Sequence, residues 1–131
     1  MVTDLYMPAE GTPMPLPESK ALTILLSEDD GIYYYNGNWE KAVKENGIYK
    51  SGFSYGSGIG KVIRDKQEML ESADTKEGKR GLMLIIKSNE KASYKNLVNI
   101  LDEILINDVK KYALVKLTKP EINYLDRINT Q

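Results

Sequence analysis

The sequence predicts an α/β domain with two layers: a mixed sheet of about four strands carries two main helices on one face, and a short C-terminal helix closes the chain. Three patterns lead to this class. A strand–helix–strand pattern occupies 81–117, a hairpin pattern precedes it at 21–35, and a helical pattern lies between them at 59–72. The chain of 131 residues has the length of one domain. We therefore expect 21–131 to fold as a single unit.

The segment 81–117 is the centre of the predicted fold. Residues 82–86 form a continuous apolar run, which is typical of a strand covered on both faces. Ser93 offers a hydroxyl N-cap to the helix that follows, and 112–117 reads as a second strand. A crossover of this length predicts a right-handed βαβ unit with parallel strands.

The helix after Ser93 is predicted to bury one apolar stripe, because apolar residues recur there at helical spacing. The stripe consists of Tyr94, Leu97, Val98, Leu101, Ile104 and Leu105. The side chains expected to face water are Lys95, Asn96, Asn99, Asp102 and Glu103.

Residues 1–20 differ in composition from the rest of the chain. They contain four of the five prolines and few bulky side chains. Closely spaced prolines exclude helix, favour extended or polyproline II conformation and withhold backbone donors from a strand ladder. We interpret 1–20 as a linker, which is either a mobile tether or an extended segment that docks on a partner.

The first predicted strands form a hairpin. Residues 21–27 are the first strand, Asp30-Gly31 supplies the turn, and 32–35 return. Residues 38–58 show no clear period, although Trp39 is expected to pack on the sheet and 41–43 to form a short helical turn. The Ala21 strand or the 112–117 strand is expected at an edge of the sheet, with unpaired backbone groups.

Two further helices are predicted from spacing and capping. In 59–72 the residues expected on the buried face are Ile59, Val62, Ile63, Met69 and Leu70, and those expected on the opposite face are Arg64, Asp65, Lys66 and Glu68. Thr118 and Glu121 form a capping box, flanked by Leu117 and Ile122 at the positions of a hydrophobic staple. This signal predicts a helix over 120–128.

Composition excludes several function classes. The chain has no His and no Cys, which removes Ser-His-Asp and Cys-His catalysis, thiol redox chemistry and zinc sites of the usual ligand sets. The formal net charge is −1 with scattered Lys and Arg, which disfavours a nucleic-acid surface. Nothing pairs Asp102 and Glu103 with a catalytic partner, so we expect no enzyme.

Two loop motifs fail on inspection. The acidic residues before Gly31 lack the spaced ligands of a calcium loop. The glycines of 52–60 do not fit phosphate-loop spacing, because Tyr55 and Val62 stand where that motif needs Gly and Ser or Thr. We expect no cofactor and no metal.

The order of elements and several short blocks resemble the periplasmic domain of the ExbD/TolR family. The blocks are Pro15-Leu16-Pro17, then 20–24, an Asp-Gly turn with Ile32-Tyr33-Tyr34, Leu84-Ile85-Ile86-Lys87, 92–98 with 100–102, and 112–115. Val2, Asp4, Leu5 and Pro8 are similar to the family's short linker motif, although Thr3, Tyr6 and Met7 interrupt it. The similarity covers about 15–125, and the 39–70 segment is longer than in compact members.

The resemblance implies a non-enzymatic subunit of a proton-driven motor. Such a subunit pairs inside an ExbB-like channel, dimerises, and couples inner-membrane energy to TonB-dependent outer-membrane transport by binding a TonB-like protein. It also implies a periplasmic domain of a single-pass inner-membrane protein, with the proton-carrying residue in a membrane helix outside this sequence. The alternatives are a TolR-like subunit that binds peptidoglycan and a small-molecule-binding α/β regulatory domain.

The candidate partner-binding residues come from two observations. The linker resemblance implies Asp4, Leu5 and Pro8. The last strand, with unpaired backbone groups if it lies at an edge, adds Tyr112, Leu114 and Lys116.

Overall fold

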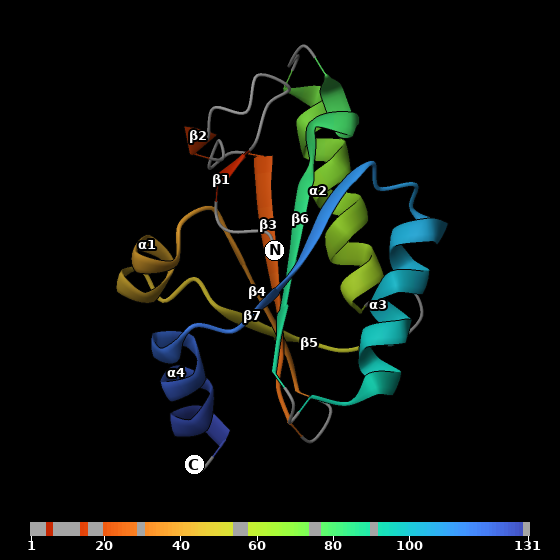
Figure 1. Cartoon of the computed structure of the whole chain (residues 1–131). Coiled ribbons are helices and arrows are strands. Elements are labelled where there is room, and N and C mark those ends of the chain that lie inside the picture. Colours follow the sequence, from red (N-terminus) through yellow and green to blue (C-terminus); the bar gives the residue numbers. More distant parts are fainter. Residues whose placement is uncertain are drawn as a thin grey trace.

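The computed structural model describes residues 5–6, 14–15, 20–28, 31–53, 58–73, 77–89 and 92–129. A five-stranded mixed sheet forms the middle of the molecule (Figure 1) and confirms the α/β class. Its strands are β3 (Ala21–Leu26), β4 (Ile32–Asn36), β5 (Tyr49–Ser51), β6 (Met83–Ser88) and β7 (Lys111–Lys116). The sheet has one strand more than expected, because three residues of β5 are too few to show a period.

The strand order is β5-β4-β3-β6-β7. β3 and β4 form the predicted antiparallel hairpin, and β5 extends it as a further antiparallel strand. β6 pairs in parallel with both β3 and β7, which confirms the βαβ unit. Of the two strands considered for the edge, 112–117 was correct and the Ala21 strand was wrong: β3 lies between β4 and β6 and is buried along its whole length.

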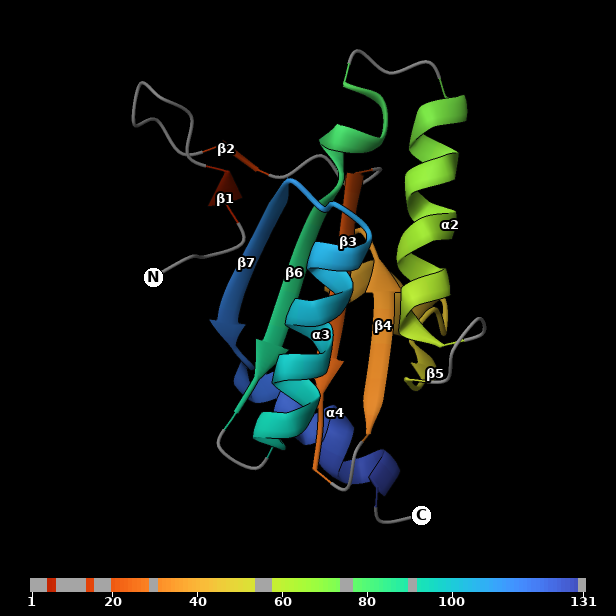
Figure 2. The same ribbon diagram turned by 90° about the vertical axis from the view of Figure 1, so that its right-hand side faces the viewer.

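Helices lie on both faces of the sheet. α2 (Ile59–Ser72) and α3 (Tyr94–Ile106) cover one face (Figure 2). The larger core lies beneath them, with Ile24, Ile63 and Ile100 among its fully enclosed side chains. The 3₁₀ helix η2 (Gly78–Gly81) leads into β6. The two predicted main helices on one face are therefore confirmed.

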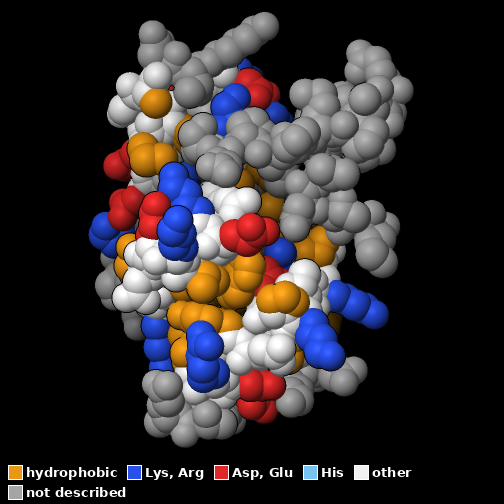
Figure 3. Space-filling view, turned by 90° about the vertical axis from the view of Figure 1, so that its left-hand side faces the viewer, with side chains coloured by type: hydrophobic (Ala, Val, Ile, Leu, Met, Phe, Trp, Pro, Cys, Tyr) orange, Lys and Arg blue, Asp and Glu red, His pale blue; other side chains and the backbone are white. Residues whose placement is uncertain are grey.

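A smaller core lies on the opposite face, where α1 (Trp39–Lys44) and α4 (Lys119–Asn129) pack. The Trp39 ring meets Tyr35 of β4 edge-on at 5.4 Å between centroids and Tyr124 of α4 at 5.6 Å, which confirms that it packs on the sheet. Hydrophobic side chains remain visible between charged ones on this face (Figure 3).

The caps predicted from the sequence are confirmed. The Ser93 hydroxyl accepts a hydrogen bond from the backbone N–H of Asn96 at 3.4 Å. At α4 the Thr118 N–H donates to Glu121 Oε1 at 2.8 Å, and the Glu121 N–H donates to Thr118 Oγ1 at 3.4 Å. Each cap satisfies backbone donors that a helix N-terminus otherwise leaves without a partner.

The predicted facing of α3 was wrong by about one position. Its buried residues are Asn96, Ile100 and Ile104, whereas Tyr94 and Leu105 are each 78% exposed. The apolar arc of the helix is wider than the arc that the sheet covers, so spacing alone did not locate its buried centre. In α2, likewise, Lys66 was expected on the outer face and is buried, while Met69 is half exposed.

The predicted linker contains one short strand pair. β1 (Leu5–Tyr6) runs antiparallel to β2 (Met14–Pro15) as a separate two-stranded sheet. The expectation that prolines withhold donors from a ladder holds for Pro15 itself, but it did not anticipate this strand pair. A proline at the end of an edge strand removes its own donor and leaves those of its neighbours in place.

Candidate partner-binding surface

The outer side of β7 is an open sheet edge. β7 pairs with β6 alone among the strands of the five-stranded sheet, so one row of its backbone N–H and C=O groups has no ladder partner within the described residues. Such a row is a template for the addition of another extended strand.

The side chains predicted for partner binding share one face of this edge. Tyr112 and Leu114 stand in register with Leu84 and Ile86, whose side chains lie in the core beneath α2 and α3. Paired residues of a parallel ladder point to the same face of the sheet. Tyr112 and Leu114 nevertheless remain 49% and 46% exposed, because β7 lies at the margin of the helical layer. Lys116, also exposed, is on the same face at the end of the strand.

The exposed flank of α3 extends this face. The flank that carries Glu103 is turned toward α2, because the Glu103 carboxylate lies against Gly60. At about 100° per residue, Tyr94 and Leu105 project from the opposite flank. That flank is on the β7 side, as the arrangement of α2, α3 and β7 shows (Figure 2).

These side chains form one surface along the open strand. We define the β7-edge surface as Tyr94, Leu105, Tyr112 and Leu114, with Lys116 at one end. The surplus width of the α3 stripe is the sequence signal for Tyr94 and Leu105. The sequence pattern assigned Tyr94 and Leu105 to the buried stripe of α3, so neither was predicted as a surface residue.

An ion-pair cluster lies at the surface at the beginning of β7. Lys111 Nζ lies 2.8 Å from Glu77, and Lys20 Nζ lies 3.6 Å from the same carboxylate. The hydrogen bond and charge of Lys111 lower the pKa of Glu77, with a smaller effect of Lys20. Because these groups are exposed, salt screens the cluster and it contributes little to stability.

The linker residues predicted for partner binding are not brought to this edge by the described structure. Asp4 and Pro8 lie outside the described residues. Leu5 lies in β1, opposite Pro15. The structure thus brings together Tyr112, Leu114 and Lys116 and leaves the role of the linker residues as a prediction.

A second feature that sequence reasoning missed is a buried ion pair on the α4 face. Lys87 Nζ donates to Glu121 Oε2 at 2.7 Å, and the side chains of Lys87 and Glu121 are only 4% and 1% exposed. The Tyr35 hydroxyl donates to the same oxygen at 3.3 Å. The apolar run predicted as a strand stopped at 86, but β6 continues through Lys87 to Ser88. Enclosed and mutually neutralised, these groups anchor α4 to the sheet.

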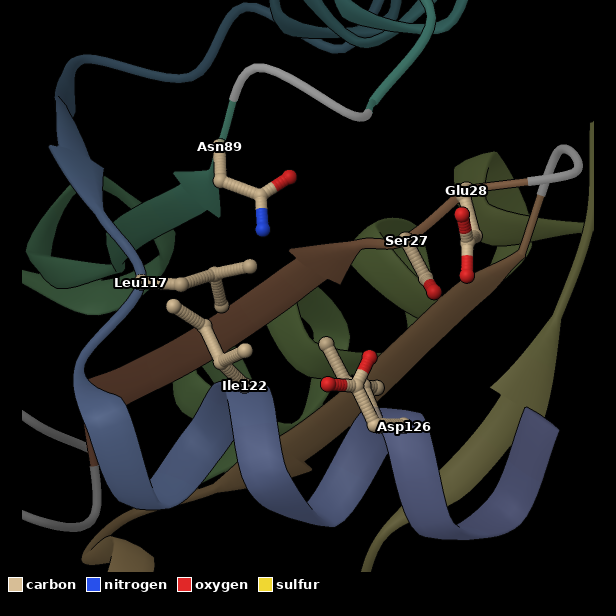
Figure 4. Close-up of a pocket in the computed structure, with 7 residues that line it drawn as sticks. Ser27, Glu28, Asn89, Leu117, Ile122 and Asp126 are labelled. Carbon is tan, nitrogen blue, oxygen red and sulfur yellow. The ribbon is translucent and has the colours of Figure 1, made fainter. Parts of the chain in front are cut away.

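A small pocket opens where the parallel strands β3 and β6 end (Figure 4). Ser27, Asn89 and Asp126 line it, and Leu117 and Ile122 form its apolar wall. Ligands of α/β proteins often bind at the carboxyl ends of strands. This pocket has a volume of only about 10 Å³, which is room for about one water molecule. It is a packing gap beneath α4.

Comparison with protein-family models, curated proteins and solved structures yields no match to this chain. Among the described residues, no cluster of three or more His, Cys, Asp or Glu side chains could hold a metal ion. None of the described helices has the length and apolar character needed to cross a bilayer.

Proposed function

We propose that this chain is the soluble, partner-binding domain of an ExbD/TolR-type motor subunit, and that it works by binding and not by catalysis. The observation that carries the proposal is the β7-edge surface, where exposed apolar side chains accompany an open strand edge. In such a subunit, motion of a membrane helix outside this sequence is passed to a partner that the soluble domain holds.

The order of elements supports the proposal. β3, β4, α2, β6, α3 and β7 follow one another as the resemblance implies, with the short α1 and β5 inserted after β4. The Ser93-Tyr94 block, which carries much of the resemblance, contains the N-cap and first residue of α3. Tyr94 itself belongs to the β7-edge surface, so this block contributes one residue to the candidate surface.

A second copy of the chain is the first occupant that we propose for this edge. Antiparallel pairing of two β7 strands about Ala113 would place Tyr112 of each copy opposite Leu114 of the other, on the same face. Cross-strand aromatic–aliphatic pairs of this kind stabilise antiparallel ladders. A TonB-like partner that supplies an extended segment would use the same backbone groups, so the two occupants compete.

Self-association is tested by placing a charge in this surface. Leu114→Glu is expected to weaken dimerisation at least tenfold, since it buries a carboxylate at the centre of the strand pair. Val43→Glu, at a 42% exposed position on α1, is the matched control and should leave dimerisation unchanged. Sedimentation velocity over rising concentration measures both. A monomeric wild type at millimolar concentration, or equal effects of the two variants, would contradict this dimer.

The motor role is tested by titrating the isotopically labelled domain with a periplasmic TonB-type fragment. We expect saturable amide shifts concentrated at Tyr94, Leu105, Tyr112 and Leu114, together with a falling dimer fraction. Shifts produced by peptidoglycan fragments, with none from the TonB-type fragment, would favour the TolR-like alternative instead. No shift with either class of partner would count against the proposed function.

A further inference from the structure

The charges along β7 differ between its two ends. At the beginning, Lys111 Nζ lies 2.8 Å from the Glu77 carboxylate. Lys110, which directly precedes the strand, has its Nζ 2.9 Å from Asp108 Oδ1. At the other end Lys116 is exposed, and no carboxylate among the described residues forms an ion pair with it. The lysines at the beginning of β7 therefore have counter-charges, whereas the lysine at its end has none within that part of the chain.

Two more lysines lie at the end of the sheet where β7 ends. α3 follows β6, and β7 runs parallel to β6, so the start of α3 lies at the same end as the last residue of β7 (Figure 2). Lys95 is the second residue of α3, Lys119 is the first residue of α4, and both are exposed. The acidic residue in the first turn of α4, Glu121, is enclosed and bound to Lys87. Within the described residues, this end of the β7-edge surface therefore carries a positive charge.

A second copy of the chain complements the apolar centre of this surface but not its charges. If antiparallel pairing about Ala113 continues to the residue before β7, Lys116 of each copy stands opposite Lys110 of the other. Like charges directly opposite each other destabilise an antiparallel ladder, and the two-fold symmetry of the dimer repeats this pair at both ends. Asp108 offers one carboxylate for the two lysines. Edge-strand lysines limit pairing between identical strands in this way, so self-association is expected to be weak.

We propose that the preferred occupant of this edge is an extended, acidic segment of another protein. Its carboxylate lies at the end that meets Lys116, and its apolar side chains lie where it crosses Leu114 and Tyr112. The inference rests on the proposed function, because it uses the same open edge, and it names the chemistry of the partner. Residues paired across a ladder share a face, so an antiparallel segment carries an acidic side chain followed by two apolar ones at alternate positions.

The probe is a synthetic peptide with glutamate, valine and valine at alternate positions and threonine between them. The control peptide has lysine in place of the glutamate. Titration of the isotopically labelled domain with the glutamate peptide should give saturable amide shifts at Tyr112, Leu114 and Lys116. The lysine peptide should bind roughly fivefold more weakly, because it exchanges an attraction for a repulsion. Raising the salt from about 0.01 M to about 0.1 M shortens the Debye length from about 30 Å to about 10 Å and should reduce this difference.

Reversing the charge of Lys116 tests the assignment directly. Lys116→Glu should prefer the lysine peptide to the glutamate peptide. It should also strengthen dimerisation, measured by sedimentation velocity, because it places a carboxylate opposite Lys110 of the other copy. Lys50→Glu is the matched control: Lys50 is exposed on β5, at the opposite edge of the sheet, and its replacement changes the net charge equally. It should leave both the peptide preference and dimerisation unchanged.

Three outcomes would overturn this inference: no saturable binding of the glutamate peptide at the β7 edge, equal binding of the two peptides, or an unchanged preference in a folded Lys116→Glu variant. Failure of the proposed function is a separate result. If a TonB-type fragment binds the edge while peptide charge has no effect, only the chemistry assigned to the partner is wrong. If the glutamate peptide binds with the expected charge dependence while neither the TonB-type fragment nor peptidoglycan shifts any amide, the acidic-strand site stands and the motor role fails.

Discussion

Glu121→Ala is expected to lower the free energy of unfolding by ~3–5 kcal/mol, the largest effect of any single polar substitution considered for this domain. The Glu121 carboxylate is 1% exposed and accepts hydrogen bonds from Lys87 Nζ at 2.7 Å and from the Thr118 N–H at 2.8 Å. Removing this carboxylate has two effects: the Lys87 ammonium stays buried without its counter-charge, and α4 loses its capping box.

Urea denaturation measures this loss, and the exposed Asp102→Ala on α3 is the control, expected to change stability by less than ~0.5 kcal/mol. Lys87→Met separates the two contributions. Combined with Glu121→Ala, it removes the stranded cation, so the double variant should be more stable than Glu121→Ala alone. A loss below ~1 kcal/mol for Glu121→Ala would show that the pair does not hold α4 on the sheet.

Ile100→Ala is expected to cost ~2–5 kcal/mol, because this side chain is fully buried in the middle of α3 and its removal leaves a cavity against β6. Leu105→Ala removes a side chain of similar size from the same helix at a position that is 78% exposed. It should change stability by less than ~0.5 kcal/mol. The pair therefore tests the facing of α3 with the helix propensity of alanine held constant.

Denaturation midpoints at unchanged m-values measure both variants. If Leu105→Ala were as destabilising as Ile100→Ala, the helix would face the sheet as its sequence pattern first indicated, and Leu105 would be lost from the β7-edge surface. If only Ile100→Ala is destabilising, Leu105→Ala becomes a second probe of that surface. It should then weaken dimerisation while leaving the fold intact.

The β7-edge surface is built on a rigid frame. The β7-edge surface depends on an unpaired strand and on the outer flank of α3. β6, next to β7, and β3 beyond it are buried almost throughout, which gives this surface a rigid support.

Elements with local signals could be predicted from the amino-acid sequence alone. Ser93 marked the start of α3, Thr118 and Glu121 marked the start of α4, and the Asp-Gly turn marked the hairpin of β3 and β4. The length of the crossover after β6 indicated the parallel pairing with β7. Caps, turns and crossovers join groups that are near one another in the chain. They can therefore be predicted from the sequence before the fold is known.

Features that depend on contacts between distant segments followed only from the folded structure. The sequence left the choice of edge open between the Ala21 strand and the 112–117 strand, because the position of a strand depends on which strands pair on either side of it. Lys87 and Glu121 are 34 residues apart, and Tyr35 and Glu121 are 86 apart, so neither contact has a sequence signal. The choice of Ile100 over Leu105 for the core, and the burial of Lys66, depend on where each helix meets the sheet. An apolar stripe wider than that contact leaves the remainder exposed, and the β7-edge surface is that remainder.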